Sequence, residues 1–299
     1  MTTQCFSLGL IGHPLEHSLS PLLHRTALQD QSLPGDYLLY DIQPLPAGQA
    51  QLAALFSKMR AAEIQGLNVT IPHKQAVIPF MDQLTPAASA VGAVNTVQCR
   101  GNCLVGDNTD GLGFMADLKR HMPDGSLVNQ KMDRAALVMG AGGAARAVVY
   151  ALAVSGWKVW LAARRLEQAN ALIADLKANS SQKSLEINSI AFDKNAVQSV
   201  AAHCQLIVNA TPLGMYPNIN SNPWPEDVSY PKKVFIYDLV YNPAETVLLR
   251  QARQAGSSAA NGAGMLVEQA ALAFEIWTGR PAPKEKMQQV MLASLRNKS

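Results

Sequence analysis

Charge is the first property that this sequence has little of. Only 16% of the 299 residues are Asp, Glu, Lys or Arg, and the formal net charge is +3 at pH 7. No block of Lys and Arg stands out, so electrostatics indicate neither a nucleic-acid partner nor a membrane surface. Hydrophobic residues make up 48% of the chain, which is ordinary for a globular protein. The sequence therefore predicts neither of these two kinds of partner.

Long apolar runs are also missing. The first residues lack the basic region and the apolar stretch of a signal peptide. The two most apolar stretches, Leu137–Val138 and Val148–Val154, are separated by Arg146 and are too short to span a bilayer. The sequence therefore predicts no membrane-spanning segment.

Cysteine is scarce, with four residues at Cys5, Cys99, Cys103 and Cys204. Cys99 and Cys103 have a loose metal-like spacing, but no second pair of ligands follows them. We expect free thiols, no metal site and a reducing cytoplasmic location.

A chain of this length exceeds the usual size of a single core, which predicts two domains. Short apolar runs alternate with helical stretches, the pattern of an α/β architecture with largely parallel sheets. The segment Pro217–Pro231 holds four of the 17 prolines and is expected to be an irregular loop.

Two series of elements are expected. The first has strands at Ser7–Ile11, Tyr37–Ile42, Gly66–Ile71 and Ala93–Val97, a helix at His17–Gln29 and further helices between the strands. The second starts near Asp133, with strands at Ala135–Met139, Trp157–Ala163, Leu185–Ala191, Leu206–Asn209 and Val234–Asp238, and helices at Ala144–Val154, Leu166–Lys177, Met265–Trp277 and Lys284–Ser294.

A glycine-rich turn, Gly140-Ala141-Gly142-Gly143-Ala144-Ala145, follows one of these strands and opens a helix. In a dinucleotide-binding turn, Gly140 allows the tight bend, Gly142 lets the backbone approach the pyrophosphate, and Ala145 permits close helix packing. The N–H groups at the helix N-terminus favour the negative phosphates. The alternative is a glycine turn that serves packing alone.

The next strand predicts which dinucleotide binds. An NAD site usually has an acid about 20 residues on, at the strand end. Here the strand ends in Ala163-Arg164-Arg165, and the first acid is Glu167. Two guanidinium groups suit the 2′-phosphate of NADP. The alternative is that both arginines only solvate the start of a helix, where cations are mildly disfavoured.

Four polar clusters lie outside that nucleotide unit. In the first, Ser20 before Pro21 is typical of a helix N-cap, which leaves Ser18 unexplained; two hydroxyls at a helix start can also bind a carboxylate. In the second, Asn68 and Thr70 share one face of a strand. Lys74 is expected in the first turn of a helix that begins near Pro72, where the helix dipole disfavours a cation.

The other two clusters are Gly92-Ala93-Val94-Asn95-Thr96 with Asn108-Thr109-Asp110-Gly111, and Gly262-Ala263-Gly264-Met265 with Gln269. Asp110 alone is equally well explained as the N-cap of a helix at Leu112–His121.

Together these patterns closely resemble the shikimate dehydrogenase family. The resemblance covers nearly the whole chain and rests on HSLSP, NVTIPHK, GAVNT, NTDG, GAGGAAR, NATPLGM, YDLVYNP and GAGMLVEQA, in the family's order. It implies NADPH-dependent reduction of 3-dehydroshikimate to shikimate. It also implies a substrate domain (1–110, completed by 263–299), an inserted Rossmann domain (111–262) and an active site in the cleft between them.

The resemblance also implies roles for single residues. Lys74 and Asp110 match the catalytic pair. The substrate carboxylate is expected at Ser18, Ser20 and Tyr241, and its hydroxyls at Asn68, Thr70, Asn95 and Gln269. NADP is expected at Gly140, Ala141, Gly142, Gly143, Ala144, Ala163, Arg164, Arg165, Thr211, Leu239 and Gly262.

One departure from the family leaves alternatives open. The usual Asn-Arg-Thr after the second strand is Ala163-Arg164-Arg165 here, which is similar to quinate/shikimate dehydrogenases that often use NAD. Those NAD users tend to place Asp after the pair, whereas this chain has Leu166, so NADP is retained. The alternatives are an NAD-preferring quinate/shikimate dehydrogenase and a non-catalytic NADP-binding sensor. A monomer and a homodimer are equally compatible with the sequence.

Overall fold

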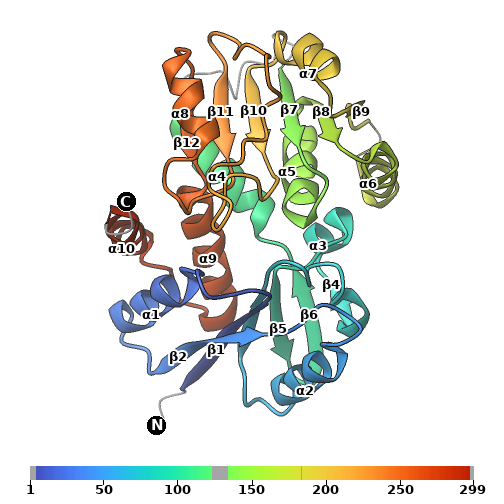
Figure 1. Ribbon diagram of the computed structural model, residues 1–299. Coiled ribbons are helices and arrows are strands. Elements are labelled where there is room, and N and C mark those ends of the chain that lie inside the picture. The colour runs from blue at the N-terminus through green and yellow to red at the C-terminus, as the bar shows by residue number, and fades with distance from the viewer. Residues whose placement is uncertain (1–4, 123–133, 183, 297–299) are drawn as a thin grey trace. The chain divides into compact units, whose positions relative to one another are not determined.

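The computed structural model describes residues 5–122, 134–182 and 184–296. These residues form two compact units. Unit 1 comprises the described residues up to 113 and those from 266 to 293, and unit 2 comprises those from 114 to 265 and from 294 onward. Unit 1 therefore joins two segments that are far apart in the sequence, coloured blue to green and red in Figure 1. The expected start of the second series, Asp133, lies outside the described residues.

Unit 1 is built on a mixed six-stranded sheet, sheet A, with strand order β2-β1-β3-β5-β6-β4. Strand β1 is parallel to β2 and β3, whereas β5 is antiparallel to both β3 and β6. The elements are β1 (Phe6–Gly12), α1 (Ser20–Asp30), β2 (Gly35–Asp41), α2 (Gln49–Arg60), β3 (Gly66–Val69), the 3-10 helix η1 (Ile78–Phe80), β4 (Gln83–Leu84), α3 (Pro86–Val91), β5 (Thr96–Arg100), β6 (Cys103–Asp107) and most of α9 (Ala263–Thr278) and α10 (Lys284–Arg296).

Unit 2 contains a fully parallel six-stranded sheet, sheet B, whose strands lie side by side in the order β12-β11-β10-β7-β8-β9 (Figure 1). This is the strand order of a doubly wound Rossmann fold. The elements are most of α4 (Asp110–His121), then β7 (Ala135–Met139), α5 (Gly143–Val154), β8 (Lys158–Ala163), α6 (Leu166–Asn179), β9 (Ile187–Ala191), α7 (Lys194–Ala201), β10 (Leu206–Asn209), β11 (Phe235–Asp238), α8 (Val247–Gln254) and β12 (Ser258–Asn261).

The central strand β7 explains why unit 2 has helices on both faces of its sheet. All five of its residues are buried. Ala136 and Val138 pack into an apolar cluster that includes residues of α5 and α6, whereas Leu137 and Met139 pack into a second cluster with α7 and α8. A strand that is apolar on both sides needs cover on both sides, which parallel sheets obtain from crossover helices. The predicted α/β class and the Rossmann unit are thereby confirmed.

Several expected elements differ from those observed. Strands β4, β6 and β12 are not among the expected elements, and the β5–β6 hairpin makes sheet A mixed rather than largely parallel. The segment 217–231 contains no helix or strand, as expected. Among residues 5–122, 134–182 and 184–296, no helix is long and apolar enough to cross a membrane.

Two local expectations are wrong. No helix begins near Pro72: the segment before η1 consists of turns, and the carbonyl oxygen of Lys74 accepts a hydrogen bond of 2.7 Å from the N–H of Val94. That carbonyl is therefore used by a distant strand segment instead of a helical turn. Ser20 is the first residue of α1 rather than its N-cap, and its own N–H donates to the hydroxyl of Ser18 at 3.3 Å.

Helix α9 packs against sheet A at Gly66. The indole N–H of Trp277 donates to the carbonyl oxygen of Val97 at 3.0 Å. A methyl group added at Gly66 would lie 2.4 Å from three atoms of the Trp277 ring. Only glycine therefore lets the indole lie this close to β3.

We expect Gly66→Ala to lower the free energy of unfolding by about 1–3 kcal/mol, because the new methyl group overpacks the contact. In a Trp277→Leu background the same change should cost less, since the ring that it collides with has been removed. Chemical denaturation of the four proteins of this double-mutant cycle measures the coupling. An equal cost of Gly66→Ala in both backgrounds would show that Trp277 does not impose the glycine.

Candidate active site

The predicted substrate residues of unit 1 gather at one edge of sheet A. Strands β1, β3 and β6 run in one direction and β5 runs in the other. The carboxyl ends of the first three strands and the amino end of β5 therefore share an edge. The predicted residues stand at that edge: Ser18 and Ser20 after β1, Asn68, Thr70 and Lys74 at and after the end of β3, Asn95 before β5, and Asp110 after β6.

Lys74 and Asp110 are in direct contact through Nζ and Oδ2. Their side chains are only 13% and 5% exposed, respectively. Removing two charges from water is costly unless they are paired and further hydrogen-bonded. The pair is thus a largely buried ammonium–carboxylate group, which is able to donate a proton or to stabilise a negative oxygen.

The amide of Asn95 organises the surroundings of this pair. Its Oδ1 accepts the N–H of Thr109 at 2.8 Å, and its Nδ2 donates to Oδ1 of Asp110 at 2.8 Å. Nδ2 also lies 3.4 Å from Oε1 of Gln269, and the Thr109 hydroxyl donates to the carbonyl of Gln269 at 3.1 Å. The structure therefore brings Lys74, Asp110, Asn95 and Gln269 into one connected group.

Asn68 lies beside this group, but its amide is already occupied. Its Oδ1 accepts the hydroxyl of Tyr37 at 2.8 Å, and its Nδ2 donates to the Asn95 carbonyl and to the Thr96 hydroxyl. Burial raises the pKa of the Tyr37 phenol well above its ordinary value, and a hydrogen bond with Ser20 only partly offsets this.

Ser18, Ser20 and Thr70 belong to the same edge, but within the described part of the chain their side chains form no hydrogen bond to Lys74 or Asp110. Ser18 is half-buried and Ser20 is buried. A methyl group at Gly12 would lie 2.4 Å from Cγ2 of Thr70, so Gly12 lets the end of β1 approach Thr70.

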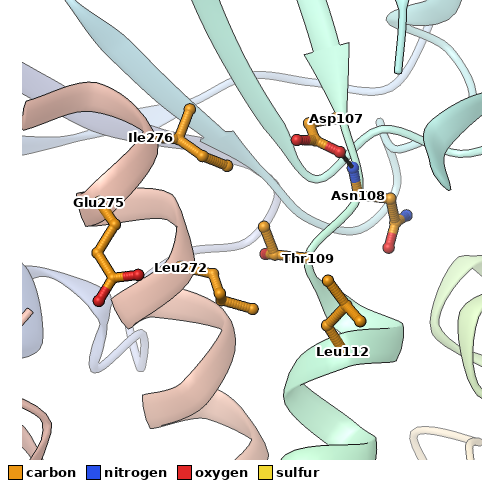
Figure 2. A pocket seen from close by; sticks show the side chains of 7 residues that line it. All are labelled: Asp107, Asn108, Thr109, Leu112, Leu272, Glu275 and Ile276. Atoms are coloured by element: carbon orange, nitrogen blue, oxygen red, sulfur yellow. Dashed lines mark hydrogen bonds between the residues drawn. The ribbon is translucent and has the colours of Figure 1, made fainter. Parts of the chain in front are cut away.

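A pocket of about 320 Å³ adjoins the start of α4 in unit 1 (Figure 2). Leu112, Leu272 and Ile276 give it apolar walls. Its two acids are already paired: Asp107 accepts from the Thr85 hydroxyl at 2.6 Å and from the N–H of Asn108 at 2.7 Å, and Glu275 accepts from the N–H of Ala282 at 3.1 Å. Both contacts of Asp107 use Oδ1 and that of Glu275 uses Oε1, so each acid still presents a second oxygen.

Sequence reasoning missed three residues of this site. Thr109 and Asn108 stand in the quoted NTDG pattern, and the structure shows that Thr109 bonds to Asn95 while Asn108 accepts the N–H of Asp110 at 3.1 Å. Tyr37 was expected only as part of a strand. A buried tyrosine must find a partner for its hydroxyl, but the burial of Tyr37 is known only from the fold, so no signal in the sequence pointed to its role.

The predicted cofactor residues of unit 2 all follow strands of sheet B. They stand after β7 (Gly140–Ala144), at and after the end of β8 (Ala163–Arg165), after β10 (Thr211), after β11 (Leu239, and Tyr241 close by) and after β12 (Gly262). Because every strand of this sheet is parallel, these positions share its carboxyl edge, where ligands of doubly wound folds bind. The order reverses between β10 and β7, next to the glycine-rich turn.

The glycine-rich turn fits a dinucleotide phosphate. Gly140 has a backbone φ of +109°, a value that residues with a side chain rarely adopt. A methyl group on Gly142 would meet nothing within 4 Å, so the turn leaves open space at the N-terminus of α5. That space and the N–H groups of the helix start suit a pyrophosphate.

The end of β8 fits a 2′-phosphate better than a free ribose. Arg164 and Arg165 are exposed, and no acid stands at the strand end. The guanidinium of Arg165 donates to Gln168 at 3.0 Å. Glu167 lies in the first turn of α6 and is exposed. Two exposed cations that no acid at the strand end neutralises could hold an added phosphate.

The fold and the two groups of residues define a class: a dinucleotide-dependent oxidoreductase with a Rossmann unit and a separate unit that carries an ammonium–carboxylate pair. Comparison with known proteins narrows this class. Residues 10–97 match the family model described as the shikimate dehydrogenase substrate binding domain, and residues 262–292 match the shikimate 5'-dehydrogenase C-terminal domain. A shikimate dehydrogenase (NADP(+)) of Salinibacter ruber is 44% identical over 287 residues, 95% of each chain. The chain belongs to the shikimate dehydrogenase family.

Two solved structures are similar over almost the whole chain. Shikimate 5-dehydrogenase from Thermus thermophilus, in complex with NADP(H) and shikimate, has a TM-score of 0.80 at 34% identity, covering 97% of this chain and 100% of that one. Quinate dehydrogenase from Corynebacterium glutamicum, in complex with NAD, has a TM-score of 0.84 at 30% identity, covering 97% and 100%.

Asp238, at the end of β11, is a buried carboxyl group of unit 2. Burial raises the pKa of Asp238 from 3.8 to about 6, and hydrogen bonds from Thr246, Val240 and Asn209 offset part of that rise. A raised folded-state pKa contributes stability below the unfolded pKa, and this contribution is lost as the pH rises through about 6.

We therefore expect Asp238→Asn to gain stability relative to the native chain as the pH rises from about 4 to about 7. The full change follows from a pKa difference of about 2 and amounts to roughly 3 kcal/mol. Chemical denaturation of both proteins across this range measures the difference between their free energies of unfolding. The titration of the other carboxyl groups is common to both proteins and cancels in this difference. A difference that stays constant with pH would contradict the raised pKa.

Proposed function

We propose that this protein is an NADP-dependent shikimate dehydrogenase, which interconverts 3-dehydroshikimate and shikimate in aromatic amino-acid biosynthesis. The observation that carries this proposal is the mostly buried pair of Lys74 and Asp110, with the amides of Asn95 and Gln269 beside it. A proton donor surrounded by amide and hydroxyl groups suits a polyol with a reducible ring ketone. Because the four cysteines are all free thiols, we place the enzyme in the cytoplasm.

Each unit has its own task in this proposal. Unit 1 binds the substrate, with Ser18 and Ser20 at its carboxylate and Asn68, Thr70, Asn95 and Gln269 at its hydroxyls. Tyr241 of unit 2 is proposed for the carboxylate as well. We propose that Asn68 contacts one substrate hydroxyl and helps to hold Asn95 in place through its hydrogen bond to the Asn95 carbonyl.

The chemical step needs a hydride for the ketone carbon and a proton for its oxygen. Bound NADPH supplies the hydride from C4 of its nicotinamide. Lys74 stabilises the negative charge on the oxygen and gives it a proton. Asp110 is the weaker candidate donor, because its two oxygens already accept from Lys74 and from Asn95. Its role is to hold the ammonium and the reacting hydroxyl in line.

Arg164 and Arg165 are proposed to bind the 2′-phosphate, which makes NADP the preferred cofactor. The rival is an NAD-preferring quinate/shikimate dehydrogenase, in which Glu167 reaches back to the ribose. Steady-state assays of the purified protein with shikimate and quinate, each against NADP and NAD, distinguish these functions. Fastest turnover of shikimate with NADP supports the proposal. Preference for quinate with NAD supports the rival, and absence of turnover with all four pairs points to a cofactor-binding sensor.

Lys74→Met should lower kcat by at least about 10²-fold while the KM for shikimate changes far less, because the proton donor acts in the transition state. The methionine keeps the apolar stem of the side chain. Lys58→Met, which removes an exposed lysine of α2, is the matched control and should behave as the native enzyme. Activity of Lys74→Met within a few-fold of native would remove Lys74 from the chemistry.

NADP should be preferred over NAD by at least about tenfold in kcat/KM, roughly 1.4 kcal/mol, a modest demand on a charge-assisted contact. Arg164→Ala should raise the KM for NADP and leave the kinetics with NAD nearly unchanged, because NAD has no 2′-phosphate. Higher ionic strength should weaken the binding of NADP more than the binding of NAD, because salt screens the contact between the arginines and the 2′-phosphate. Arg250→Ala, an exposed arginine of α8, is the matched control. Equal turnover of the native enzyme with NAD would overturn the arginine assignment.

A further inference from the structure

A buried polar pair at the carboxyl edge of sheet B has no part in the proposed chemistry. Asn209 ends β10 and Asp238 ends β11, and both are 0% exposed. Nδ2 of Asn209 donates to Oδ1 of Asp238 at 2.8 Å. The strands that carry them are hydrogen-bonded neighbours, with the two residues in register. The pair therefore joins the ends of two central strands.

The contacts of Asp238 use both of its oxygens. Oδ1 also accepts the N–H of Val240 at 3.0 Å, and Oδ2 accepts the hydroxyl of Thr246 at 2.6 Å. Thr246 is the N-cap of α8 and accepts the N–H of Leu249. None of these interactions of Asp238 involves a cation. Burying a carboxyl group without a counter-ion costs folding free energy. We therefore expect its hydrogen bonds to have a role that an apolar side chain could not fill.

The contacts of Asn209 lead to a predicted cofactor residue. Its Oδ1 accepts both the N–H and the hydroxyl of Thr211, at 2.9 and 2.7 Å. The Thr211 oxygen in turn accepts the N–H of Leu213 at 3.2 Å. The amide thus fixes the backbone and the χ1 rotamer of Thr211 together.

The segment after β11 is also hydrogen-bonded to Asn209 and Asp238. The N–H of Leu239 donates to the carbonyl of Asn209 at 2.9 Å, and the N–H of Gly262 donates to the carbonyl of Val240 at 3.2 Å. A methyl group at Gly262 would lie 2.2 Å from the carbonyl oxygen of Leu239. Three of the predicted cofactor positions, in loops after three different strands, are therefore tied to one buried pair.

We propose that Asp238 and Asn209 are positioning residues of the cofactor site, whose hydrogen bonds hold Thr211, Leu239 and Gly262 in their places at the sheet edge. This inference rests on the proposed function, because these three positions are assigned to the cofactor there. Hydrogen bonding, rather than the negative charge of Asp238, is what the arrangement requires. A neutral carboxamide can accept from Val240 and Asn209 and donate to Thr246 in the same geometry.

The test is equilibrium binding of NADP+ and NAD+ to the full chain, followed by calorimetry, so that no turnover is needed. Asp238→Ala and Asn209→Ala should each raise both dissociation constants by roughly tenfold, which corresponds to about 1.4 kcal/mol. The ratio of the two constants should stay native, because the 2′-phosphate contacts are untouched. The double variant should cost little more than either single one, because the two side chains act as a unit. Asp238→Asn should bind both cofactors within about threefold of native.

Each outcome decides the inference. Native affinity in a folded Asp238→Ala or Asn209→Ala protein overturns it, as does additive loss in the double variant. If both alanine variants fail to fold, Asp238→Asn still decides: near-native binding supports positioning by hydrogen bonds, and tenfold weaker binding assigns the role to the charge and overturns the inference. A native chain that binds neither cofactor refutes the proposed function instead. That result is separate, because it is read from the native protein alone.

Discussion

Contact between the Lys74 ammonium and the Asp110 carboxylate is the interaction on which the proposed chemistry depends. Charges this well buried persist only with partners for their remaining hydrogen-bonding groups. The edge of sheet A provides those partners, because β5 enters where β3 and β6 leave. Asn95 then reaches Asp110, and Gln269 from α9 completes the group. Gly66 lets α9 lie against β3, so the packing of this helix on sheet A also positions Gln269 in the site.

Each unit contains an asparagine whose amide bonds both an aspartate side chain and the N–H of a threonine. In unit 1, Asn95 donates to an aspartate at 2.8 Å and accepts the N–H of a threonine at 2.8 Å. In unit 2, Asn209 donates to Asp238 at 2.8 Å and accepts the N–H of Thr211 at 2.9 Å. An amide has an acceptor and a donor on one rigid plane, so it fixes the geometry of both neighbours. The difference lies in charge: Asp110 has a lysine beside it, whereas the described partners of Asp238 are all neutral.

Much of unit 2 could be predicted from sequence because its pattern is local. A five-residue apolar strand, a glycine-rich turn and a helix follow one another directly around Gly140, and each has a strong backbone preference. The same local reasoning failed at Lys74. The helix expected there does not form, because the carbonyl of Lys74 is used by Val94, about 20 residues away in the chain. The capping role expected for Ser20 failed by one position, since α1 already begins at that residue.

The sequence by itself determined the α/β class, the dinucleotide turn and the polar residues that a polyol site needs, because periodicity and short-range turn chemistry depend on neighbours along the chain. Only the tertiary structure decided which of those residues meet. Lys74 and Asp110 are brought together because β3 and β6 run in the same direction in a mixed sheet, and β6 is not among the strands that the sequence predicts. The roles of Tyr37, Thr109 and Asp238 were likewise invisible, because a hydrogen bond between distant segments exists only after the backbone has placed its donor and acceptor.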